Sequence, residues 1–297
     1  MIDTGGTVAE LTDQVRAIHD AGIQAAGISQ IFGYDALTVL AVAGSQVPDV
    51  ELVTGVVPTY PRHPFVLAAQ ALTVQAATGG RLTLGIGLSH KLVIESIWGL
   101  SFDQPVRHMR EYLAVLMPLL RGEGVGFEGE TFQVNAGPLD VKAPAPDVLV
   151  AALGPRMLEL TGQVADGTMT WMTGPKTIEV HTVPDITAAA SAAGRKAPRV
   201  AVSLPVSVTA DVDAARATAN EVFAIYGQLP SYRAMLDREG AAGSGDVAVV
   251  GDEDAVSAQL RHLADVGATD FIAAPFGSPD DQARTKAVVA DLARSGA

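Results

Sequence analysis

The sequence has no cysteine among its 297 residues. Disulfide bridges, thiolate metal sites and cysteine nucleophiles are therefore excluded. Aromatic residues make up only 5% of the chain, while hydrophobic residues make up 48%. Alanine, valine and leucine must therefore fill most of a core that is large enough for a sizeable enzyme domain.

Positive charge is also scarce, because 20 Lys and Arg residues face 33 Asp and Glu residues, a net charge of −13. Such a surface repels nucleic-acid phosphates and anionic lipids, so neither is expected as a partner. No stretch of about 18 apolar residues predicts a membrane-spanning helix. The start of the chain, MIDTGG, lacks the basic and apolar regions of a signal peptide, so a cytoplasmic location is expected.

Short β-branched segments alternate with amphipathic segments of helical period. The pattern predicts seven strands, at residues 24–29, 51–57, 81–86, 147–152, 167–171, 200–208 and 269–274. Helices are predicted at residues 7–21, 35–44, 64–78, 105–120, from Pro155 onward, and at 211–226, 231–239, 254–266 and 280–294. Residues 125–135 are predicted to form a hairpin.

Strands that alternate with helices form parallel sheets. We therefore predict an α/β fold, a (β/α)8 TIM-type barrel with insertions, as a single domain over residues 1–297. Only Met1 to Asp3 are available for the first strand, which is short or truncated. An open doubly wound sheet is the alternative.

The strongest local signal is GGRLTLGIGLSHK at residues 79–91. A strand ends in Gly85-Ile86-Gly87, and Leu88, Ser89 and His90 follow. Glycines at a strand end let a flat ring or a phosphate approach the backbone. His90 could transfer a proton near neutral pH. The alternatives are a tight turn and a histidine without a catalytic role.

Two later turns share a second pattern, in which a strand leads through glycine and proline into a helix. They are Leu153-Gly154-Pro155, followed by Arg156, and Thr173-Gly174-Pro175. Exposed amides at a helix start attract anions, and proline there loses no hydrogen bond. Two adjacent turns of this kind favour phosphate binding over ordinary capping.

Other candidate groups are better explained structurally. Gly55 ends a strand before a proline-rich loop, in which Arg62 and His63 favour a structural role over anion binding. Glu10, Asp13 and Glu111 are interpreted as solvated or capping carboxylates. No histidine pair has metal-ligand spacing on a helix, so no metal site is predicted.

From Gln24 onward the chain resembles the luciferase-like monooxygenase superfamily, and within it the actinobacterial oxidoreductases that use coenzyme F420. The segments that carry the resemblance are TGVVPTYPRHPFVLAAQALT, GGRLTLGIGLSH, HMREYLAVLMPLLRGEGVGFEGETF and VLVAALGPRMLELTGQVADGTMTWMTGP. The combination is specific, although each segment alone is not.

The resemblance implies a barrel that holds F420, or alternatively FMN, at the ends of its strands. It implies a cis peptide at Gly55–Val56 beside the cofactor ring, with Gly87, Leu88, Ser89 and His90 next to it. Leu153, Gly154, Pro155, Thr173 and Gly174 match the phosphate-binding turns. Replacing Gly87 by a bulky residue is expected to block the cofactor and leave the fold intact.

The sequence departs from F420-dependent glucose-6-phosphate dehydrogenases at two places. Ser29-Gln30-Ile31-Phe32 replaces an Asp-His pair, and His90 stands where those enzymes have a glutamate acid. Hydride transfer between F420 and a small organic substrate is the leading hypothesis. An FMN-dependent two-component monooxygenase and a non-catalytic flavin-binding homologue stay open, and a homodimer is possible by resemblance. Residues 30–37, 91–104 and 226–245 are expected to shape the substrate pocket.

Overall fold

The computed structural model describes residues 1–295. The chain forms two compact units. The N-terminal unit comprises Ile2–Asp20 and Gln24–Ala151, and the C-terminal unit comprises Met1, Ala21–Ile23 and Ala152–Ala297. The two units are described separately, and organisation as a single domain stays a prediction.

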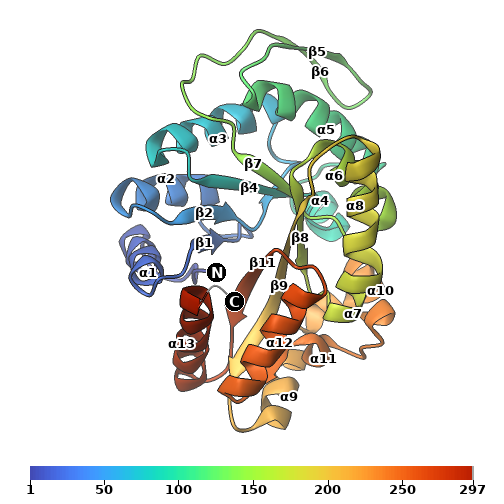
Figure 1. Cartoon of the computed structure of the whole chain (residues 1–297). Helices are drawn as coiled ribbons and strands as arrows, with labels where there is room; N and C mark the ends of the chain where they lie inside the picture. Colours follow the sequence, from blue (N-terminus) through green and yellow to red (C-terminus); the bar gives the residue numbers. More distant parts are fainter. Residues whose placement is uncertain (296–297) are drawn as a thin grey trace. The chain divides into compact units, whose positions relative to one another are not determined.

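In the N-terminal unit a parallel sheet is covered by helices (Figure 1). Its strands are β1 (Ala25–Ile28), β2 (Glu51–Thr54), β3 (Val57–Pro58), β4 (Leu82–Gly87) and β7 (Asp147–Val150), with the hairpin strands β5 (Val125–Glu128) and β6 (Gln133–Ala136). Its helices are α1 (Val8–Asp20), α2 (Ala36–Gln46), α3 (Pro64–Thr78), α4 (Lys91–Ser96) and α5 (Pro105–Leu120). Strands β1, β2, β4 and β7 are parallel neighbours in that order, and β3 pairs with β4.

The C-terminal unit is built around the long strand β9 (Arg199–Val208), which pairs in parallel with β8 (Gly167–Trp171), β10 (Val249–Gly251) and β11 (Asp270–Pro275). Its helices are α6 (Pro155–Val164), α7 (Pro175–Thr177), the π-helix η1 (Ile178–Thr182), α8 (Val183–Ala192), α9 (Val212–Val222), the 3₁₀-helix η2 (Ala224–Gln228), α10 (Pro230–Glu239), α11 (Ser244–Val247), α12 (Glu253–Asp265) and α13 (Pro279–Ser295).

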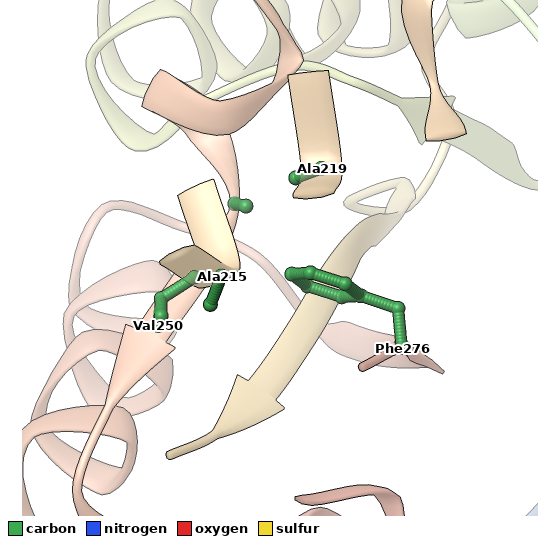
Figure 2. Close-up of a cluster of buried hydrophobic side chains, with 5 residues drawn as sticks. Ala215, Ala219, Val250 and Phe276 are labelled. Atoms are coloured by element: carbon green, nitrogen blue, oxygen red, sulfur yellow. The ribbon is translucent and has the colours of Figure 1, made fainter. Parts of the chain in front are cut away.

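The burial of the strands explains their composition. Every residue of β4 is buried, and so is every residue of β9 after Arg199. Continuous apolar strands of this kind are typical of parallel sheets that are covered on both faces. Figure 2 shows how small residues complete the core, because Ala215 and Ala219 on α9 leave room for the ring of Phe276.

Strong local signals predicted several elements to the residue. Helix α3 spans 64–78 as predicted, because Pro64 begins it and Gly79, with φ 68°, ends it in the left-handed conformation. Helix α5 and strand β8 also have their predicted bounds.

Other elements differ from the predictions. The strand expected at 51–57 is interrupted after Thr54 and divides into β2 and β3. The expected first strand is not formed, although the Ile2 amide donates to the Gly27 carbonyl at 2.8 Å. Helix α4 and strand β10 were not predicted. The helix start predicted at Pro175 is present, and the helical segment that begins there continues through η1 and α8 to Ala192.

The described residues contain no helix that is both long and apolar enough to cross a membrane.

Candidate functional site

The strand ends of the N-terminal unit bring the first group of candidate residues together. The Ser29 hydroxyl, just after β1, donates to the Gly55 carbonyl at 2.7 Å. The Thr54 hydroxyl donates to the Gly85 carbonyl at 2.8 Å and ties β2 to β4. The Gly55–Val56 peptide is cis, which confirms the expectation from the resemblance.

The glycines of β4 are required by close packing within the protein. A Cβ atom on Gly85 would overlap the Thr54 carbonyl oxygen. A Cβ atom on Gly87 would lie 2.7 Å from Val56 Cγ2 and 3.1 Å from Ala151 Cβ. A bulky residue at position 87 would therefore collide with Val56 and Ala151 and lower the stability of the fold. That this substitution leaves the fold intact stays a prediction.

The turn after β4 places His90 at the start of helix α4. Leu88, Ser89 and His90 are all half-buried, and Ser89 has the left-handed φ of 60°. The His90 side chain makes no cap hydrogen bond to that helix. Burial lowers the pKa of His90 below its ordinary value, so the neutral imidazole predominates at neutral pH.

The loop after β3 has a structural role, as its sequence indicated. The Arg62 guanidinium pairs with the Asp35 carboxylate and donates to Gln30 Oε1 at 3.2 Å. His63 Nδ1 accepts from the Phe65 amide at 3.3 Å and caps helix α3. These contacts use both side chains within the scaffold.

In the C-terminal unit the turn before α6 has the features of an anion site. Gly154 is exposed and occupies the N-cap position, with φ −81° and ψ 155° and without a side-chain cap. A Cβ atom on Gly154 would meet nothing within 4 Å. Arg156 is exposed one residue after Pro155, and Leu153 is half-buried before it. The turn therefore has space, a helix N-terminus and a cation for a phosphate.

The turn before α7 is different, although its sequence looks alike. The Glu239 carboxylate accepts from the Lys176 amide at 3.1 Å, the Thr177 amide at 2.7 Å and the Thr177 hydroxyl at 2.6 Å. Thr173 and Gly174 are both buried, and the Thr173 hydroxyl donates to the Trp171 carbonyl at 3.2 Å. The expectation of exposed amides at this helix start is therefore wrong. A cofactor contact by Thr173 and Gly174 stays a prediction.

Comparison with known proteins decides the family. Residues 1–270 match the model of the luciferase-like monooxygenase family. The chain belongs to this family.

Individual relatives of this luciferase-like protein differ in reaction. The 5,10-methylenetetrahydromethanopterin reductase of Archaeoglobus fulgidus is 31% identical over 262 residues, which cover 86% of this chain and 74% of that protein. The structure of the coenzyme F420-dependent tetrahydromethanopterin reductase of Methanopyrus kandleri matches with a TM-score of 0.79 at 24% identity, over 96% of this chain and 94% of that one. The structure of the EDTA monooxygenase of Chelativorans sp. BNC1 matches with a TM-score of 0.80 at 18% identity, over 97% of this chain and 87% of that one.

These matches confirm the predicted fold class, an α/β barrel of the TIM type. They do not separate a reductase from a monooxygenase by fold, because the two structures match almost equally well. Fold alone does not define function.

Sequence reasoning missed a buried cluster in the N-terminal unit of this luciferase-like protein. The His108 ring stacks on the Tyr60 ring with centroids 3.9 Å apart, and His108 Nε2 lies 3.1 Å from the Thr59 hydroxyl. Burial lowers the pKa of His108 to about 4, although Glu111 opposes the shift. Burial, with Asp103 nearby, raises the pKa of Tyr60 to about 12. Both groups are neutral at physiological pH, and the cluster stabilises the loop after β3.

Glu111 also differs from its predicted state, because it is buried and only 7% exposed. Its carboxylate accepts from three backbone amides of the β5–β6 hairpin, those of Glu130, Thr131 and Phe132. Desolvation alone would raise its pKa, but these hydrogen bonds outweigh it and lower the pKa. Glu111 therefore holds the hairpin to α5.

The expected substrate segments supply aromatic side chains in both units. In the N-terminal unit Phe102 stacks on Tyr60 with centroids 5.4 Å apart. In the C-terminal unit Tyr226 packs edge-to-face on Trp171 at 5.6 Å and on Tyr232 at 5.1 Å. Their role toward a substrate stays a prediction.

A second residue that the sequence did not indicate is His181, on the π-helix η1. Its Nε2 lies 2.8 Å from the carbonyl oxygen of Leu153, which belongs to the predicted phosphate turn. Short π-helical segments are often found at functional sites, but the sequence did not indicate η1, which only the tertiary structure shows. Among residues 1–295, no group of three or more His, Asp and Glu side chains could hold a metal ion.

Proposed function

We propose that this protein is an F420-dependent oxidoreductase that transfers a hydride between the deazaflavin and a small organic substrate. The observation that carries the proposal is the contact between the Gly55–Val56 turn and Gly87, at adjoining strand ends. The absence of a side chain at Gly87 lets Val56 pack directly on β4, and a flat ring could then lie against the two turns. The sequence similarity to a methanopterin reductase supports a reductase over other classes.

The residues present fit such a cofactor. Gly154 has open space beside a helix N-terminus, as a phosphate group requires. We propose that the ring is held by Gly55, Val56, Gly87, Leu88, Ser89 and His90, and that phosphate is bound by Leu153, Gly154, Pro155 and Arg156, with Thr173 and Gly174 in a smaller part.

Bound F420 would supply a ring carbon that accepts or donates a hydride. Oxidation of an alcohol to a carbonyl releases a hydride from carbon and a proton from the hydroxyl group. The protein must therefore move one proton for each hydride transferred. We propose that His90 takes this proton from the substrate hydroxyl, as the neutral imidazole favoured by its lowered pKa. In the reverse direction the protonated His90 would return it to the carbonyl oxygen.

The pH dependence tests the role of His90. We expect the kcat/KM for oxidation of small secondary alcohols to be constant above a pH of about 6.5. Below that pH, kcat/KM should decline as His90 becomes protonated. Replacement by His90→Gln should lower kcat/KM by about a hundred-fold and remove this decline. His262→Gln, at an exposed position of α12, is the control. An unchanged pH profile in His90→Gln would exclude this role.

A direct binding experiment tests the cofactor. The purified protein is mixed with F420, F420H2 or FMN, and retention and fluorescence quenching are measured. Binding of F420 at micromolar concentration without retention of FMN is the expected result. Selective retention of FMN would instead support a two-component monooxygenase, which the match to the EDTA monooxygenase favours as second candidate. Binding of neither would support a non-catalytic homologue.

A cytoplasmic location and a homodimer also stay predictions. Neither is needed for the binding experiment, which uses the whole chain.

A further inference from the structure

His181 is a buried histidine whose ring lies between two acceptors. Only 4% of the residue is exposed. Its Nε2 is 2.8 Å from the Leu153 carbonyl oxygen, and its Nδ1 is 2.9 Å from Asp185 Oδ2. The Leu153 carbonyl can only accept, so Nε2 donates to this oxygen. The Asp185 carboxylate lies against the other ring nitrogen.

The Leu153 carbonyl is one half of the peptide that joins Leu153 to Gly154. This peptide is trans, since Gly55–Val56 is the one cis bond in the described chain. In a trans peptide the carbonyl and the following N–H point in opposite directions. Because His181 holds the Leu153 carbonyl, the Gly154 N–H points away from the His181 ring. Gly154 is exposed, with open space where a Cβ atom would lie.

Asp185 fixes the ring in this position. It lies four residues after His181 along the helical segment, where side chains are neighbours. The Glu239 carboxylate of α10 is occupied by its own three donors on Lys176 and Thr177. The His181 ring has one partner that holds it, Asp185, and one that it orients, the Leu153 carbonyl.

We propose that His181 is a positioning residue for anion binding, which orients the Gly154 amide toward the phosphate of the cofactor. The inference rests on the proposed function, because it takes the turn before α6 as the phosphate site. It assigns to His181 a role in affinity for the phosphate group and none in contact with the ring.

The experiment compares ligands that differ only by their phosphate-bearing tail. Affinity is measured for F420 and for its phosphate-free deazaflavin, and likewise for FMN and riboflavin, with His181→Leu, His181→Gln and wild type. His181→Leu should weaken F420 binding by about ten-fold and leave the phosphate-free ligand within about two-fold, because the hydrogen bond that orients the Gly154 amide is lost. His181→Gln, which keeps a donor, should lie between. His262→Leu is the control.

A second measurement needs no cofactor. Nitrogen-15 NMR of the labelled protein follows the Gly154 amide. Titration with inorganic phosphate should shift the Gly154 amide signal in wild type and not in His181→Leu.

The outcomes separate this inference from the proposed function. If neither F420 nor FMN binds, the proposed function fails, and the phosphate titration decides the inference alone. Equal weakening of both ligands of a pair, or the same phosphate response in wild type and His181→Leu, would overturn it.

Discussion

The helix starts at Gly154 and Gly174 share a sequence pattern and have different surroundings. Each follows a strand, each has glycine at the N-cap and each has proline next. At Gly154 a Cβ atom would meet open space, whereas at Gly174 it would lie 2.6 Å from Glu239 Oε1. The first start can accept a ligand, while the second already holds an anion supplied by the protein.

The difference shows what a helix start needs to become a binding site. Its unpaired amides require an acceptor, and a carboxylate from another helix satisfies them as well as a ligand would. Glu239 is the last residue of α10 and lies 62 residues after Thr177 in the sequence. No local pattern around Gly174 reveals this partner.

Removal of the protein's own anion should have the largest effect. Glu239→Ala leaves two amides of the α7 start without their acceptor, and the Thr177 hydroxyl keeps only its 3.4 Å contact with the Met235 carbonyl. We expect a loss of about 2–3 kcal/mol in the free energy of unfolding, because each lost partner is a charge-assisted hydrogen bond and water replaces part of it. Urea denaturation measures the loss, with the exposed Glu221→Ala as control. A loss as small as that of the control would show that the amides are satisfied in another way.

A side chain placed in the open space at Gly154 should weaken cofactor binding and leave the stability of the protein almost unchanged. The backbone at Gly154 is extended, so Gly154→Leu introduces no strain and its side chain enters the open space. We expect F420 affinity to fall by about ten-fold or more, equal to about 1.4 kcal/mol, with an almost unchanged melting temperature. Gly137→Leu is the matched control, since Gly137 is exposed and a Cβ atom there also meets nothing within 4 Å. Equal F420 affinity in Gly154→Leu and wild type would remove this turn from the site.

The smallest effect is expected from removing one contact of Glu239. Thr177→Val deletes the hydroxyl that donates to Glu239 at 2.6 Å and keeps the amide contact. The free energy of unfolding should fall by about 1 kcal/mol, while Thr177→Ser, which keeps the hydroxyl, should lose less. Combination with Glu239→Ala should add almost nothing, because the acceptor is already absent. Full additivity in urea denaturation would contradict the contact.

The candidate site was predicted only in part. The positions of Gly55, Gly87 and Gly154 at strand ends and helix starts followed from glycine and proline chemistry, and the cis peptide followed from family resemblance. The sequence did not indicate Ser29, whose hydroxyl donates to Gly55, or His181, which contacts Leu153. Ser29 lies 26 residues from its partner in the sequence, and His181 lies 28 residues from its partner. Side-chain periodicity reports only on neighbours within a few residues, so it cannot indicate these contacts.

The sequence by itself determined the alternation of strands and helices, the bounds of α3 and α5, and the buried character of β4 and β9. These follow from hydrophobic period, caps and burial, which act over a few residues. Only the tertiary structure decided that Glu239 occupies one helix start, that Glu111 is buried against a hairpin, and that His181 lies between two acceptors. Such contacts join groups far apart in the chain, and the free energy of each depends on desolvation and geometry that exist only after folding.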